Sequence, residues 1–113
     1  MSEVLLHVAG SNFNLPRAPG IAPREGMVGR EYNKSTTEKA AMVAALKESF
    51  AFLQGRIAEL TAADAEKKIA WCDGETTYGG VPYFMARHTA EHTGQLIAYA
   101  RMNRVVPPWS EGN

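Results

Sequence analysis

The sequence predicts an all-α protein, a helical bundle of three main helices and one short extra helix. Apolar residues recur at intervals of three and four over about residues 36–60 and 82–103, the period of a helix with one buried face. A shorter stretch with the same spacing covers residues 2–15. The 113 residues suffice for one modest core, so we expect a single domain, 1–113.

Composition argues against several classes of function. The 12 Lys and Arg residues balance the 12 Asp and Glu residues, so no excess of positive charge predicts a nucleic-acid partner. We find neither a secretory signal nor the run of roughly 18 apolar residues that spans a membrane. Cys72 is the only cysteine, which fits a reducing cytoplasm. We therefore expect a cytoplasmic protein that binds neither nucleic acid nor membrane.

The first predicted helix, residues 2–15, ends before Pro16, because a proline disfavours helical geometry in the residue before it. Residues 16–35 then contain three prolines and three glycines, a composition typical of a loop. A connection of about 20 residues is uncommon in a compact domain. It indicates a crossover between distant helices or a lid.

The second predicted helix, residues 36–60, has the clearest periodicity. Ser35 and Glu38 have the spacing of a capping box. The apolar residues that follow have the pattern of the seam of an antiparallel bundle. They are Val43, Leu46, Phe50, Leu53, Ile57 and Leu60.

Between the second helix and the last one, the sequence predicts a short helix and a loop. The short extra helix covers residues 61–69, where Thr61 and Asp64 have the spacing of a helix cap. Residues 73–80 are rich in glycine and threonine and are predicted as a turn-rich loop. Near the C-terminus, we expect Trp109 to pack back against the bundle.

The last long helix, residues 82–103, carries polar groups at its predicted core positions. Buried imidazoles lose free energy unless they find partners. His88 and His92 lie four residues apart, so on a helix they differ by about 40° in direction and can face a common object. This spacing fits a divalent metal; it also fits a hydrogen-bonded or surface pair. The core positions are Met85, His88, His92, Gln95, Tyr99 and Met102.

The zinc-protease motif His-Glu-x-x-His shares the spacing of this pair. Here the sequence is His88-Thr-Ala-Glu91-His92, with the glutamate beside the second histidine. On a helix Glu91 projects about 100° away from His92. It is therefore poorly placed as a general base, and we reject the protease interpretation.

Two segments resemble the DinB-like family of metalloenzymes: residues 5–12, LLHVAGSN, and residues 88–96, HTAEHTGQL. Residues 97–109 resemble the end of that domain. The resemblance implies a four-helix bundle with up-down-down-up topology and a crossover between its second and third helices. That crossover corresponds to the loop at 16–35.

The resemblance also implies the metal ligands. The family binds its metal with one histidine on the second helix and a His-x-x-x-His pair on the fourth, which correspond here to His7, His88 and His92. The family's first helix has no counterpart, because the chain begins six residues before His7. A bundle truncated to three main helices exposes apolar surface, so we expect a homodimer.

Three imidazoles leave a coordination position open to water or a thiol. Imidazole suits zinc, nickel, copper and iron, and we expect one divalent ion, zinc or nickel. The resemblance implies transfer of a low-molecular-weight thiol to an electrophilic small molecule, with hydrolysis as the other enzymatic possibility. Gln95 and Tyr99 are candidates for substrate contact or for ordinary core polar residues. Two non-enzymatic hypotheses stay open: a metal-binding, stress-linked interaction protein, and a metal-free remnant with hydrogen-bonded histidines.

Overall fold

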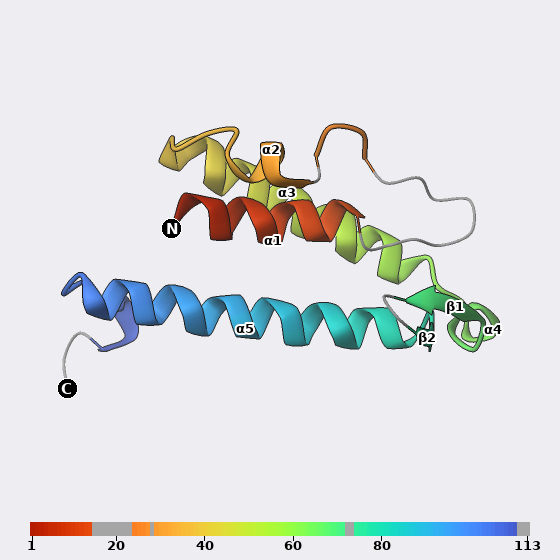
Figure 1. The fold of residues 1–113 in the computed structure, drawn as a ribbon. Coiled ribbons are helices and arrows are strands. Elements are labelled where there is room, and N and C mark those ends of the chain that lie inside the picture. The colour runs from red at the N-terminus through yellow and green to blue at the C-terminus, as the bar shows by residue number, and fades with distance from the viewer. Residues whose placement is uncertain (15–23, 28, 72–73, 111–113) are drawn as a thin grey trace.

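The computed structural model describes residues 1–14, 24–27, 29–71 and 74–110. Its three long helices run side by side in a down-down-up order, because α1 and α3 point the same way and α5 points the opposite way (Figure 1). Two parallel helices need a connection that returns along their length, as the expected crossover does. The long helices are α1 (Ser2–Asn14), α3 (Lys39–Ala58) and α5 (Gly80–Met102).

Residues 16–23 and 28 of the predicted connection at 16–35 lie outside the described residues. Leu15 and Cys72 also lie outside them. Its described part contains a short helix, α2 (Gly29–Asn33), which the sequence did not predict. α2 packs on α1. The connection therefore contributes a packed element beside the first helix.

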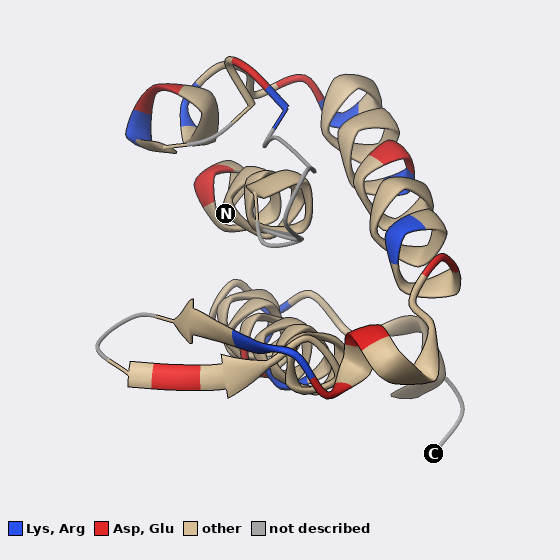
Figure 2. Cartoon of the chain, turned by 90° about the vertical axis from the view of Figure 1, so that its right-hand side faces the viewer, with Lys and Arg blue, Asp and Glu red and all other residues tan. Residues whose placement is uncertain are grey.

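The helix α1 is the centre of the arrangement, because it contacts α2, α3 and α5. Figure 2 shows α1 nearly end-on, with these three helices on different sides of it. Its most extensive contact is with α3. The apolar core on this helix consists of Leu6, Val8, Ala9 and Phe13.

A second apolar cluster joins α3 to the beginning of α5. Leu53 of α3 and Val81 and Met85 of α5 are buried together. Ile69, Trp71 and Phe84 pack against this group. The cluster anchors the end of α5 that leads toward His88.

The segment between α3 and α5 folds into a single helical turn and a β-hairpin. The turn is α4 (Ala62–Ala65), with the predicted capping box of Thr61 and Asp64 in place. The hairpin pairs β1 (Lys68–Trp71) with β2 (Gly74–Thr77) in antiparallel register, Lys68 opposite Thr77. The prediction of a helix to residue 69 was therefore wrong. The predicted turn-rich loop at 73–80 was wrong for the strand at 74–77, whereas residues 78 and 79 do form a turn and residue 73 lies outside the described residues. Isoleucine and threonine favour extended backbone, and pairing of the two strands satisfies their backbone groups.

The helix α3 differs from prediction at its start and along its seam. Its N-cap is Glu38, which has no side-chain cap, and the Glu38 N–H donates to Thr36 Oγ1. The predicted Ser35 capping box is absent. Val43 and Ile57 are 41% and 37% exposed, whereas Leu53 is buried. The reason is that α3 packs mainly on one helix, α1, so its buried face is narrower than the seam of a complete bundle.

The last described element after α5 is a short 3-10 turn, η1 (Pro108–Ser110). Trp109 within it is 68% exposed, so the predicted packing against the bundle was wrong. Among the described helices, none combines the length and the apolar character needed to cross a membrane.

Candidate metal centre

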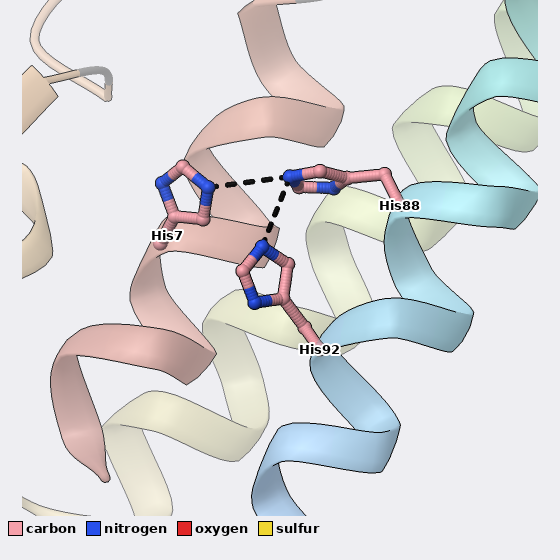
Figure 3. Close-up of side chains that lie close together, drawn as sticks. All are labelled: His7, His88 and His92. Carbon is pink, nitrogen blue, oxygen red and sulfur yellow. Dashed lines mark hydrogen bonds between the residues drawn. The ribbon is translucent and has the colours of Figure 1, made fainter.

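The three histidines of the chain meet where α1 faces α5 (Figure 3). His7 comes from α1, and His88 and His92 come from successive turns of α5. The Nε2 atom of His88 lies 3.2 Å from Nε2 of His7 and 3.1 Å from Nε2 of His92. All three rings are partly buried. In the part of the chain that the structure describes, this is the one cluster of three or more His, Cys, Asp or Glu side chains arranged to hold a metal ion.

The spacing of these nitrogens fits a divalent metal. Ligands at 2.0–2.1 Å from a tetrahedral ion lie about 3.3–3.4 Å apart. Two of the three separations come within a few tenths of an ångström of that value, and all ligand atoms lie within 4.8 Å of one another. The described cluster is all imidazole, a donor set that suits zinc, nickel, copper and iron.

The protons on these rings supply an independent test of the fit. A neutral imidazole carries one N–H, so its other nitrogen has a bare lone pair. The Nε2 atom of His88 faces two other Nε2 atoms at hydrogen-bond distance, but a single proton makes only one strong hydrogen bond. At most one of the two contacts can therefore be a strong hydrogen bond, whereas a cation between the rings can accept a lone pair from each of them. The arrangement fits a shared metal better than a chain of hydrogen bonds.

A hydrogen bond fixes the orientation of His92. Its Nδ1 lies 2.9 Å from Oε1 of Gln95, and because a carboxamide oxygen only accepts, Nδ1–H is the donor. The proton is thus on Nδ1, and the lone pair of Nε2 points toward the other histidines. Gln95 in turn donates from Nε2 to the hydroxyl of Tyr99, at 3.1 Å. Metal-binding histidines commonly have such an outer partner.

His88 is held by packing. The Phe84 ring lies one turn earlier on α5 and stacks on His88, with centroids 6.1 Å apart and planes 15° apart. Trp71 of the hairpin meets Phe84 edge-on at 5.1 Å. The hairpin therefore supports the imidazole through one intervening ring. Nδ1 of His88 is buried and has no hydrogen-bond partner among the described residues.

The electrostatic environment favours neutral imidazoles, the form that binds metal. Burial lowers the pKa of His7 below 6.5, and the neighbouring His92 lowers it further. Burial also lowers the pKa of His88, with added repulsion from His92 and His7. The negative charge of Glu91 raises the pKa of His88, but this effect is smaller than those of burial and the two histidines. Both rings therefore lose their protons more readily than an exposed histidine does.

Three other residues of α5 that the sequence singled out, Glu91, Gln95 and Tyr99, are not part of the histidine cluster. Glu91 is exposed on α5, consistent with the rejection of the protease motif. Gln95 and Tyr99 form a chain of hydrogen bonds that ends on His92. The contact between Gln95 and His92 was not predicted from the sequence, although their three-residue spacing on a helix allows it. The polar side chains that lie near His7 on the side of α2, among them Ser11, Arg30 and Asn33, were not predicted either. Their grouping depends on the packing of α2 on α1, which no local sequence pattern indicates.

A family model described as the DinB superfamily matches residues 2–96, which is most of the chain and includes all three histidines. No curated protein and no solved structure matches the chain.

Proposed function

Because this chain belongs to the DinB superfamily, we propose that it is a metal-dependent enzyme that transfers a low-molecular-weight thiol to an electrophilic small molecule. Its ligands in this proposal are His7, His88 and His92. The observation that carries it is the convergence of three Nε2 atoms from two helices on one point. No other ligand from the described residues joins that point, so the proposal leaves a coordination position for the substrate.

A divalent metal supplies such a site with the means to lower the pKa of a coordinated thiol, so that its sulfur is nucleophilic near pH 7. The protein's own contribution is to hold three neutral imidazoles in place. Lowered pKa values keep His7 and His88 unprotonated. Gln95 holds the His92 ring so that its lone pair faces inward.

We propose zinc or nickel as the resident ion, since both accept imidazole nitrogen. Elemental analysis of protein purified without a metal-affinity tag tests this. We expect close to one equivalent of one of these metals per chain. Less than about a tenth of an equivalent, with no thermal stabilisation on adding either ion, would support the metal-free alternative.

The enzymatic proposal is tested by following thiol consumption with a panel of electrophiles. We expect turnover by the metal-loaded protein and loss of turnover in His88→Ala, because that ring touches both other histidines. Glu91→Gln is the matched control on the same helix, since Glu91 is exposed. Equal rates for the wild type and His88→Ala would refute thiol transfer.

A non-catalytic metal-binding or stress-linked interaction protein is the second candidate. One observation favours it: the described metal cluster contains only histidines, with no carboxylate among them. Acid–base chemistry, including hydrolysis, needs a group to move protons near the site. Metal binding at full occupancy without turnover of any thiol or ester would support this candidate.

We further propose a cytoplasmic homodimer. The radius of gyration is 15.8 Å, compared with about 13 Å for a compact domain of this length. Several large apolar side chains are exposed, which supports a second copy as their cover. A monomeric mass in light scattering at micromolar concentration would contradict the dimer. The exposed residues include Val43, Ile57, Tyr83, Tyr99 and Met102.

A further inference from the structure

A polar cavity of about 400 Å³ lies between α1 and α2, beside the candidate metal centre. This volume falls within the range of small-molecule sites, about 300–1,000 Å³. His7 lines the cavity and also belongs to the histidine cluster. A molecule bound there therefore lies next to a proposed metal ligand. The polar side chains around the cavity are Glu3, His7, Ser11, Asn14, Arg30 and Asn33.

One wall of the cavity is a face of α1. Glu3, His7, Ser11 and Asn14 are separated by four, four and three residues, so they align along one side of the helix. From Glu3 to Asn14 this face extends for about 16 Å. His7 stands between the acidic end and the neutral polar end.

The opposite wall is α2, and Gly10 determines how closely it approaches. A Cβ atom at Gly10 would lie 3.0 Å from the carbonyl oxygen of Met27 and 3.1 Å from Cδ1 of Tyr32. A larger residue would require the Met27 carbonyl and the Tyr32 ring to move by a few tenths of an ångström. The close approach brings Arg30 and Asn33 to the cavity. Gly29, also on the lining, has φ +89°, a conformation that favours glycine.

The charges around the cavity are of opposite sign. Glu3 is the only acidic residue of α1, and Arg30 is the only basic residue of α2. Figure 2 shows α2 next to α1, with one acidic position on α1. Within the described part of the chain, neither side chain has an ion pair or a side-chain hydrogen bond. Both are exposed and available to a ligand.

We infer that this cavity is a subsite for an amino-acid-derived thiol, with the carboxylate of the ligand on Arg30 and its ammonium group on Glu3. Arginine binds a carboxylate through two parallel N–H donors, and a carboxylate of glutamate accepts from an ammonium group. Ser11, Asn14 and Asn33 offer neutral hydrogen-bonding groups to the remainder of a ligand the size of a small peptide. The inference rests on the proposed thiol chemistry, because the thiol end of the ligand would have to reach the metal past His7, the residue that the cavity shares with the histidine cluster.

Four small thiols with different charged groups test the subsite: L-cysteine carries both charges, 3-mercaptopropionate only the carboxylate, cysteamine only the ammonium group and 2-mercaptoethanol neither. The full chain is loaded with cobalt(II), and each dissociation constant is measured from the sulfur-to-cobalt absorption band. The variants are Arg30→Gln and Glu3→Gln. Arg101→Gln and Glu31→Gln are the matched controls, since neither residue lines the cavity.

We expect Arg30→Gln to raise the dissociation constants of cysteine and 3-mercaptopropionate on the order of fivefold, as for the loss of a charged pair near the surface. The dissociation constants of cysteamine and 2-mercaptoethanol should stay unchanged. Glu3→Gln should raise the dissociation constants of cysteine and cysteamine and leave those of the other two thiols unchanged. The controls should match the wild type. Equal affinities across the four thiols in all variants would overturn the subsite while leaving thiol binding at the metal intact.

A second measurement separates failure of the subsite from failure of the proposed function. L-serine, which lacks the thiol, is titrated into metal-free protein, and the backbone amide signals of Gly10 and Gly29 are followed by NMR. Shifts in the wild type that disappear in Arg30→Gln would support the subsite even if no thiol altered the cobalt spectrum. If no thiol altered the spectrum and serine caused no shifts, both the subsite and the thiol proposal would be wrong.

Discussion

Gln95 accepts a hydrogen bond from Nδ1 of His92 at 2.9 Å, one turn along the same helix. This contact determines which nitrogen of His92 carries the proton and turns Nε2 toward His7 and His88. Gln95 also donates to Tyr99, so the orientation of the amide is itself fixed. The polar residues that follow the histidine pair on α5 thus support the site from outside.

Replacing Gln95 with leucine should weaken metal binding about 10- to 100-fold, the usual cost of losing the outer partner of a ligand. Leucine keeps the approximate size of the side chain but cannot accept from Nδ1–H. Competition titration with a chromophoric chelator measures the change. Thr93→Ala is the control, because the Thr93 hydroxyl donates to the Thr89 carbonyl on the exposed side of α5, away from the histidines. Wild-type affinity in the leucine variant would show that His92 is oriented by packing alone.

The metal-free protein should lose stability as the pH falls below about 6.5, the ordinary histidine value. Burial, with added repulsion from neighbouring histidines, lowers the pKa of His7 and His88 in the folded state. At a pH between 6.5 and those lower values, the unfolded chain binds more protons than the folded one, so a fall in pH favours unfolding. Above pH 6.5 these two groups do not change the free energy of unfolding with pH. Urea unfolding at a series of pH values measures the effect. The double variant His7→Gln/His88→Gln should flatten the dependence, and an unchanged slope would contradict this account.

Gly10→Ala should destabilise the protein by about 1–3 kcal/mol, as overpacking does. The added Cβ would press on the Met27 carbonyl oxygen, which cannot rotate away. Gly55→Ala is the matched change on α3, where nothing lies within 4 Å of the new atom. That variant should gain about 0.5–1 kcal/mol from the helix propensity of alanine. Thermal unfolding of both variants provides the comparison, and opposite signs are the expected result.

Ser49→Ala should cost about 1–3 kcal/mol, because it leaves a buried amide donor without a partner. Asn12 and Ser49 are both fully buried and join α1 to α3 through Asn12 Nδ2 and Ser49 Oγ, 3.1 Å apart. The double variant Asn12→Leu/Ser49→Ala removes both polar groups and should recover part of the loss. Denaturant unfolding of the two single variants and the double variant measures the coupling. Additive losses would show that the pair does not act as a unit.

The sequence by itself determined the features that depend on neighbouring residues along one helix. His88 and His92 face the same way because backbone hydrogen bonds fix a rotation of about 100° per residue. The capping box of Thr61 and Asp64 is likewise local, and the structure confirmed it. The three long helices were predicted near their observed bounds for the same reason.

Only the tertiary structure decided what depends on how faces pack. His7 lies 81 residues from His88 in sequence, and its place in the cluster follows from the antiparallel packing of α1 and α5. From the residues alone, His7 could not be joined to the pair; the family resemblance supplied that step. Packing also exposed Val43 and Ile57, buried Ser49 and formed the cavity beside His7. Helical periodicity tells which residues share a face, but the partner of that face is chosen by contacts between distant segments.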